Sequence, residues 1–330
     1  MSLTDAYGRK IEYLRISLTD KCNLRCRYCM PEEGIKRLRH EELLSLEELY
    51  RVAGVLSEMG ITRIRLTGGE PLVRKGVTGF VERLSELPSH PQLALTTNAV
   101  LLADKLEGFA KAGLTSLNIS LDTLDRACFE RLTGTDALED VRRAIDMAYD
   151  MGFHIKLNAV PIVGVNDKSL PDLAAYARDR RIDVRFIELM PIGCAVHMQG
   201  MRQQEILAVL AESFGTPETI PADGTSRMEE SGPAEYVHFP GFAGRVGLIS
   251  PISHSFCEQC NRIRLTVDGL LKLCLYYPDG LDVRALLRAG CTDDELADRI
   301  RESIGKKPKE HCFFNEKDTE DKRNMFEIGG

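Results

Sequence analysis

The sequence predicts an α/β protein built as an open six-stranded (β/α)6 partial TIM barrel, followed by a separate C-terminal domain. Short β-like runs alternate with helical periods from residue 11 to residue 190, which is typical of a parallel sheet with helices outside it. One face of these strands is apolar and the other is polar, which a sheet covered on both faces or a filled barrel would not tolerate. With 330 residues, we expect two domains, over residues 1–200 and 201–330.

Six segments form the expected strands, near residues 12–18, 61–67, 92–97, 116–121, 154–160 and 183–190. Helical periodicity separates them, as over residues 46–56, and Gly60, Gly113 and Gly152 stand where a helix would end before the next strand. Six such units are too few for a closed eight-stranded barrel. The count alone also fits a doubly wound sheet, so the faces of the strands decide.

Each strand separates its side chains when it is read with a period of two. The apolar face holds Leu14, Ile16, Leu18, Ile64, Leu66, Leu93, Leu95, Leu117, Ile119, Leu121, Ile155, Leu157, Ile187 and Leu189. The other face carries charges at Arg15, Arg65, Lys156 and Glu188. Because an unpaired buried charge is costly, we interpret this face as the lumen of a barrel that holds a polar ligand. The alternative is that these charges pair with one another or reach solvent.

Three cysteines, Cys22, Cys26 and Cys29, form a CxxxCxxC run directly after the first strand. Converging thiolates suit a soft metal or an iron–sulfur cluster. A structural zinc site normally has four protein ligands, and the next candidate, His40, lies well beyond the run. A four-iron cluster held by three cysteines leaves one iron open for another ligand. An incomplete zinc site or three reduced thiols remain the alternatives.

The second strand ends in Gly68-Gly69-Glu70-Pro71. Paired glycines at the end of a strand allow the backbone to approach a ligand closely. The stretch from residue 193 to residue 232 is less regular and contains one helical run over residues 205–213. We place the domain boundary near residues 193–215.

A second cysteine set, Cys257, Cys260 and Cys274, lies in the C-terminal half. Asp268-Gly269 predicts a hairpin between Cys260 and Cys274, which would return Cys274 to the Cys257–Cys260 loop. We interpret this as a second three-thiolate site; a zinc site completed by His254 is the alternative. The remaining cysteines are expected to be isolated thiols: Cys128, Cys194, Cys291 and Cys312.

Arg262 and Arg264 alternate with apolar residues and therefore share one strand face beside this cysteine set. Two fixed guanidinium groups suit a phosphate or another electron-rich ligand; a solvated strand face is the alternative. The charged run over residues 306–323 reads as a solvated tail, but it ends in apolar residues and Gly329-Gly330. These apolar residues could anchor the tail while the glycines enter a narrow crevice; a disordered end is the alternative.

The formal net charge of −7 argues against a nucleic-acid-binding surface. No apolar run approaches about 18 residues, so no membrane span is expected. The ten cysteines are clustered and the first residues do not resemble a targeting segment. We therefore expect a reducing, cytoplasmic location in which the thiols bind metal.

The CxxxCxxC run with Tyr28 before its last cysteine, followed by Gly-Gly-Glu-Pro, resembles the radical S-adenosylmethionine (SAM) enzymes. With Tyr7-Gly-Arg9, residues 187–191, Cys-Asn-Arg-Ile-Arg after Cys257 and the terminal Gly-Gly, nearly the whole chain resembles the GTP 3′,8-cyclases of molybdenum cofactor biosynthesis. The resemblance implies two [4Fe–4S] clusters, SAM and a GTP substrate. A SAM-derived radical then takes the ribose 3′ hydrogen to form 3′,8-cyclo-7,8-dihydro-GTP.

The resemblance also implies a set of site residues. The clusters would be held by Cys22, Cys26 and Cys29, and by Cys257, Cys260 and Cys274. SAM would contact Tyr28, Gly69, Ser120 and Met190. GTP would contact Arg15, Arg65, Thr96, Lys156, Arg262, Ile263 and Arg264. Catalytic roles fall to Arg262, Arg264, Gly329 and Gly330.

The resemblance further implies an electron donor and a downstream partner, cyclic pyranopterin monophosphate synthase. A homodimer or a monomer is expected. Two alternatives to the cyclase stay open at this point. One is another radical SAM enzyme with an auxiliary cluster, of the peptide-maturase type. The other is a zinc-stabilised interaction protein without activity.

Overall fold

The computed structural model describes residues 3–31, 38–219, 232–313, 321 and 323–329. Its strands form one sheet in the order β12-β11-β10-β1-β2-β3-β4-β5-β6-β9-β8-β7. The six predicted strands are confirmed and lie at its centre: β1 (Tyr13–Ser17), β2 (Arg63–Thr67), β3 (Gln92–Thr97), β4 (Ser116–Ser120), β5 (His154–Ala159) and β6 (Asp183–Ile187).

The C-terminal half of the chain extends this sheet at both edges. One edge gains β10 (Arg262–Leu265), parallel to β1, and the other gains β9 (Arg245–Ile249), parallel to β6. Antiparallel strands then complete the two edges: β11 (Leu270–Lys272), β12 (Gly280–Asp282), β8 (Glu235–His238) and β7 (Glu218–Thr219). Among the described residues β12 and β7 do not pair. The barrel is therefore open, as predicted, whereas the shared sheet was not foreseen; the two-domain division stays a prediction.

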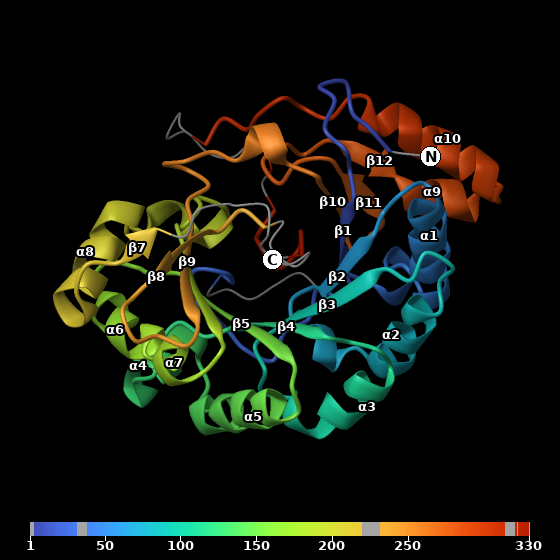
Figure 1. The fold of residues 1–330 in the computed structure, drawn as a ribbon. Helices are drawn as coiled ribbons and strands as arrows, with labels where there is room; N and C mark the ends of the chain where they lie inside the picture. The colour runs from blue at the N-terminus through green and yellow to red at the C-terminus, as the bar shows by residue number, and fades with distance from the viewer. Residues whose placement is uncertain (1–2, 32–37, 220–231, 314–320, 322, 330) are drawn as a thin grey trace.

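Helices pack around the outside of the strands (Figure 1). They are α1 (Leu46–Glu58), α2 (Val77–Ser85), α3 (Leu106–Lys111), α4 (Arg126–Thr133), α5 (Leu138–Asp150), α6 (Leu170–Ala174), α7 (Tyr176–Asp179), α8 (Gln203–Phe214), α9 (Val283–Arg288) and α10 (Asp293–Ile304). Short 3-10 turns are η1 (His40–Glu42), η2 (Pro71–Val73), η3 (Ala103–Lys105), η4 (Asp167–Ser169), η5 (Gly193–His197) and η6 (Cys257–Gln259).

The ends of the helices follow from local sequence. Ser45 accepts a hydrogen bond from the backbone of Glu48 and the Glu48 carboxylate accepts one in return, so α1 begins with a capping box. Beyond the ends of α1, α3 and α5, Gly60, Gly113 and Gly152 have positive φ angles, as predicted. The helical predictions over residues 46–56 and 205–213 are confirmed by α1 and α8.

The apolar faces of β1 to β5 pack against these helices, as predicted, and their residues are almost fully buried. The sixth strand departs from the prediction. It ends at Ile187, and its outward residues are Val184 and Phe186, both buried in the core. Arg185 and Ile187 line the lumen instead, so the prediction that Ile187 faces the helices was wrong. Counting the irregular residues 188–190 as strand shifted the period by one.

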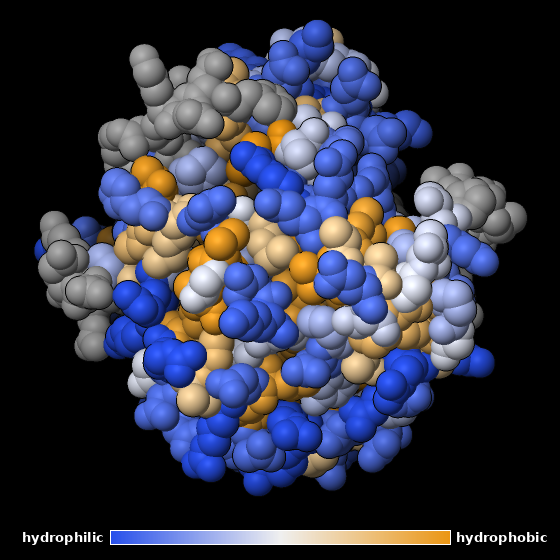
Figure 2. Space-filling model, turned by 90° about the vertical axis from the view of Figure 1, so that its left-hand side faces the viewer, coloured by the Kyte–Doolittle hydropathy of each residue, from blue (hydrophilic) through white to orange (hydrophobic). Residues whose placement is uncertain are grey.

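The side of the molecule that carries α6 and α8 is mostly hydrophilic, with smaller groups of hydrophobic residues near its middle (Figure 2). Within the described ranges, no helix has the length and apolar character needed to cross a membrane.

Candidate active site

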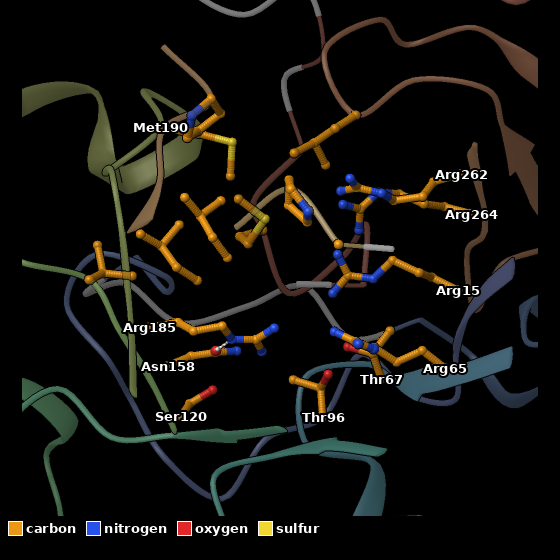
Figure 3. Close-up of a pocket in the computed structure, with 18 of the residues that line it drawn as sticks. Arg15, Arg65, Thr67, Thr96, Ser120, Asn158, Arg185, Met190, Arg262 and Arg264 are labelled. Atoms are coloured by element: carbon orange, nitrogen blue, oxygen red, sulfur yellow. Dashed lines mark hydrogen bonds between the residues drawn. The ribbon is translucent and has the colours of Figure 1, made fainter. Parts of the chain in front are cut away.

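The polar faces of the strands enclose a cavity of about 490 Å³ inside the barrel. Its wall contains residues from β1 to β6, from both cysteine sets and from β10. Figure 3 shows cationic side chains from β1, β2, β6 and β10 pointing into this common space. Arg15, Arg65 and Lys156, which were predicted to face the lumen, do line this cavity, and both cysteine sets border it.

The first cysteine loop turns tightly after β1. The backbone N–H groups of Cys29 and Met30 both donate to the Cys26 carbonyl at 2.9 Å, which brings Cys22, Cys26 and Cys29 to the cavity wall. Burial raises the pKa of all three thiols, that of Cys29 to about 12, and neighbouring cysteines contribute to the rise for Cys26 and Cys29. A bound metal ion would stabilise the thiolate form of these cysteines, which burial and the neighbouring thiolates otherwise disfavour.

The donor set fits an iron–sulfur cluster. The three thiols are free of disulfides, belong to one loop and border the cavity. In the part of the chain that the structure describes, no three His, Cys, Asp or Glu side chains are arranged as ligands of one metal ion. A four-iron cluster is larger than one ion and takes thiolate ligands. The proposal below therefore places a cluster on this loop.

The Gly68-Gly69 turn packs directly on the chain that leads into this loop. A Cβ atom at Gly68 would lie 2.6 Å from the Thr19 carbonyl oxygen, and one at Gly69 would lie 2.5 Å from that of Lys21. The Gly69 N–H donates to Thr19 at 2.7 Å. The two glycines are therefore required for packing, whether or not they also contact a ligand.

Glu70, the next residue, is fully buried and accepts hydrogen bonds from Thr97 Oγ1 and from the backbone N–H groups of Leu72 and Asn98. Burial raises the pKa of Glu70 to about 7 although these three donors favour its charged form. The carboxylate thus joins the end of β2 to the end of β3.

The residues predicted to hold SAM, Tyr28, Gly69, Ser120 and Met190, all line the cavity. The Tyr28 hydroxyl donates to Asp122 at 2.7 Å, and the other Asp122 oxygen accepts from the Val160 N–H at 2.8 Å. This network joins the cysteine loop to the ends of β4 and β5. Burial raises the pKa of Asp122.

The cationic wall contains Arg15, Arg65, Lys156, Arg262 and Arg264, together with Thr96. Register places Arg15 between Arg65 on β2 and Arg264 on β10. Burial, and then these two neighbouring charges, hold the pKa of Arg15 well below its usual value. Buried Nε atoms of Arg65 and Arg262 have no hydrogen-bond partner among the described residues. Like charges placed this close together repel one another, so this wall favours an anionic ligand.

Two lumenal residues differ from the sequence-based expectation. Arg185 was missed, although it is 5% exposed, lines the cavity and donates to Asn158 Oδ1 at 2.9 Å. The sequence pattern that could have indicated its lumenal position is an arginine between two apolar residues, Val184 and Phe186, which both face the core. Glu188 was predicted as a lumenal charge. Its carboxylate accepts hydrogen bonds from Ser253 and from the Ile252 N–H, so both of its oxygens bind the loop at residues 252–253.

The predicted hairpin at Asp268-Gly269 is confirmed: β10 pairs with β11, and Gly269 has a φ of +90°. It returns Cys274 to Cys257 and Cys260, which line the same cavity. Arg262 and Arg264 face the cavity beside them, and Arg262 stacks over the Phe256 ring. The Ile263 side chain instead packs in the core, so only its backbone is available to a ligand.

One of the four other cysteines lies close to the first cysteine set. The Cys194 thiol contacts Asn324 Oδ1 of the C-terminal tail at 3.5 Å, and it is near enough to Cys29 to affect the pKa of that thiol. The Cys128 thiol donates to the Val165 carbonyl.

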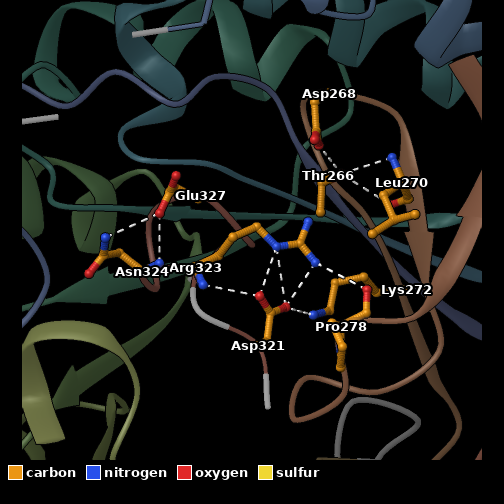
Figure 4. Close-up of polar contacts among 9 residues, drawn as sticks. All are labelled: Thr266, Asp268, Leu270, Lys272, Pro278, Asp321, Arg323, Asn324 and Glu327. Atoms are coloured by element: carbon orange, nitrogen blue, oxygen red, sulfur yellow. Dashed lines mark hydrogen bonds and ion pairs between the residues drawn. The ribbon is translucent and has the colours of Figure 1, made fainter. Parts of the chain in front are cut away.

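The C-terminal tail is anchored by ion pairs and hydrogen bonds (Figure 4), and its residues Met325 and Phe326 line the cavity. The Asp321 carboxylate pairs with Lys272, which is fully buried on β11, and with Arg323. Farther along, Phe326 and Ile328 are buried. Gly329 accepts a hydrogen bond from Arg264 at 3.1 Å. Gly330 lies outside the described residues.

Asp321→Asn is expected to loosen this anchor, because it leaves Lys272 buried without a full counter-charge. Breaking a buried pair costs about 3 kcal/mol, and release of the tail avoids that cost. Hydrogen exchange at the amides of residues 323–329 should then accelerate by roughly 100-fold. Glu302→Gln, which breaks the exposed pair with Lys306, is the control and should change nothing. Unchanged exchange in Asp321→Asn would remove this pair from the anchor.

Comparisons with known proteins give two family matches that together span most of the chain. The radical SAM superfamily matches residues 16–177, and the molybdenum cofactor synthesis C family matches residues 182–313. A GTP 3′,8-cyclase of Clostridium perfringens (strain 13 / Type A) is 41% identical over 99% of this chain and 100% of its own length. One of Peptoclostridium acidaminophilum is 45% identical over 99% of this chain and 98% of its own.

Among solved structures, that of Streptococcus suis SuiB is similar in fold, with a TM-score of 0.61 and 16% identity over 97% of this chain and 78% of SuiB. At that identity the likeness concerns the fold alone. The full-length matches to the cyclases carry the assignment: the chain belongs to the radical SAM superfamily and, within it, to the GTP 3′,8-cyclase family.

Proposed function

We infer that this chain is a GTP 3′,8-cyclase, which forms 3′,8-cyclo-7,8-dihydro-GTP in the first step of molybdenum cofactor biosynthesis. The observation that carries this function is one cavity bordered by two three-cysteine sets and lined by a wall of arginine and lysine side chains. Cys22, Cys26 and Cys29 would hold the first [4Fe–4S] cluster, which with SAM would supply the 5′-deoxyadenosyl radical for removal of the ribose 3′ hydrogen, and Cys257, Cys260 and Cys274 would hold the second.

The protein's own residues bind and orient the substrates. We propose that Arg15, Arg65, Thr96, Lys156 and the Arg262–Arg264 strand bind GTP, with Arg185 as a further phosphate contact. A triphosphate offsets the mutual repulsion of these cations, and guanidinium groups bind phosphate oxygens in pairs. Tyr28, Gly69, Ser120 and Met190 would hold SAM, and Tyr28 belongs to the first cysteine loop itself.

The direct test is anaerobic incubation of the reconstituted protein with SAM, a reductant and GTP. We expect 5′-deoxyadenosine together with a cyclised GTP product, and neither when ATP replaces GTP. Deoxyadenosine without any GTP product would favour another radical SAM enzyme, and a colourless protein without iron would favour the zinc-stabilised alternative.

We also propose that a separate electron donor reduces the enzyme and that its product passes to cyclic pyranopterin monophosphate synthase.

Lys156→Ala is expected to weaken GTP more than SAM. Lys156 is 8% exposed on β5 and lines the cavity, and loss of a charge-assisted hydrogen bond costs about 1.5–3 kcal/mol. The Kd for GTP should therefore rise roughly 10- to 150-fold, as measured by calorimetry, while that for SAM changes little. Lys168→Ala, at an exposed position, is the control. An equal loss of both ligands would indicate a folding defect instead.

Cys274→Ser is expected to prevent GTP cyclisation while SAM cleavage continues, because the two cysteine sets belong to separate segments of the chain. Iron content should fall to about half that of the unchanged protein if each set holds one four-iron cluster. Iron analysis and product chromatography test this. Unchanged iron with normal product would remove Cys274 from the ligands.

A further inference from the structure

A buried lysine lies behind the second cysteine set. Lys307, which follows α10, is only 3% exposed. Its Nζ donates to the carbonyl oxygen of Arg262 at 2.9 Å and to that of Leu273. Lysines are almost never fully buried without a specific partner, so these two contacts explain its position.

The two carbonyl groups flank cluster ligands. Arg262 begins β10 two residues after Cys260, and Leu273 directly precedes Cys274 after β11. The single ammonium group of Lys307 therefore binds both strands of the hairpin, β10 and β11, at the end that carries Cys260 and Cys274.

The third cysteine is held in the same way from the N-terminal segment. Arg9 Nη1 donates to the Cys257 carbonyl oxygen at 2.7 Å, and its Nε pairs with the buried Asp5 at 2.6 Å. The Arg9 guanidinium also donates to the carbonyls of Pro308 and Lys309, at 2.6 and 2.8 Å. Arg9 is thereby joined to the segment that follows Lys307.

Charge supports the same arrangement. Burial lowers the pKa of Lys307, and nearby Cys260 and Cys274 oppose that shift because their thiolates favour the ammonium form. Arg262 and Arg264 line the cavity, whereas Lys307 and Arg9 are absent from its wall. The second cysteine set therefore has cationic side chains on two sides: Arg262 and Arg264 on the side of the cavity, and Lys307 and Arg9 on the side away from it.

We propose that Lys307 and Arg9 form a clamp that positions the three cysteine-bearing segments of the second cluster, and that Lys307 supplies positive charge on the side away from GTP. Lys307 is then a positioning residue whose charge also stabilises the reduced, more negative state of the cluster. Its removal should lower iron loading at this site and make the reduction potential of the remaining cluster more negative.

This inference rests on the second cluster of the proposed function, but its test needs no GTP, so the two can fail separately. The experiment uses the full chain with Cys22, Cys26 and Cys29 replaced by alanine, in which iron reports the second site alone. Lys307→Met and Lys307→Gln are compared with Lys306→Met, which removes an exposed neighbouring charge. Iron and sulfide content, potentiometric titration by electron paramagnetic resonance and thermal melting of the metal-free protein are measured.

We expect at least a three-fold lower iron content in Lys307→Met and a more negative potential in Lys307→Gln, which keeps a donor but loses the charge. Lys306→Met should match the parent in both. Should Lys307→Met fail to fold, the potential of Lys307→Gln alone decides. If the Lys307 variants that fold have the same iron content and reduction potential as the parent, the proposed clamp is wrong.

Discussion

Cys26→Ser is expected to abolish the formation of 5′-deoxyadenosine from SAM. A cluster on this loop has three protein ligands, and Cys26 is the central one, whose carbonyl also receives the two N–H groups that turn the loop. Serine has nearly the same size but offers a hard oxygen donor in place of a soft thiolate. The loop should therefore keep its shape and lose the cluster.

The measurement is deoxyadenosine production with dithionite as reductant, combined with iron analysis. Cys128→Ser is the matched control, because this buried thiol only donates to the Val165 carbonyl, which a hydroxyl can also do. That variant should retain both iron and SAM cleavage. Deoxyadenosine at the unchanged rate in Cys26→Ser would show that this loop is not the cluster site.

The strand-by-strand polarity of the sequence was sufficient to predict the barrel and its cationic lumen. Strand periodicity is a local property, so the inward positions of Arg15, Arg65 and Lys156 follow from their neighbours in sequence. The phase of β6 was wrong because the irregular residues after Ile187 continue an apolar pattern without continuing the strand. One residue of error exchanged the faces and hid Arg185.

Contacts between distant segments could not be predicted in this way. Lys307 approaches Arg262 across 45 residues and Arg9 approaches Cys257 across 248, and no periodicity in the sequence encodes either contact. The same holds for the extension of the central sheet by β9 and β10. Local patterns predicted the hairpin between Cys260 and Cys274, but its pairing with β1 depends on the packing of the whole chain.

Gly329→Ala is expected to lower the rate of GTP cyclisation at least about ten-fold while leaving both clusters loaded. Gly329 has a φ of +77°, a conformation that costs an L-residue about 1–2 kcal/mol. An added Cβ would also lie 3.1 Å from Ser17 Cβ and 3.2 Å from Thr67 Cγ2. The strain would displace the carbonyl that Arg264 Nη1 contacts, and Arg264 is a proposed GTP ligand.

The control separates this displacement from the backbone cost alone. Gly241 has a similar φ of +80° but nothing within 4 Å of an added Cβ, so Gly241→Ala should reduce stability slightly and leave cyclisation unchanged. Deletion of Gly329 and Gly330 should have at least the effect of Gly329→Ala, because Arg264 then loses its carbonyl partner. Cyclised GTP, iron content and melting temperature are compared for the three variants. If Gly329→Ala and the deletion both turn over GTP at the unchanged rate, the tail is anchored beside the cavity without contributing to the reaction.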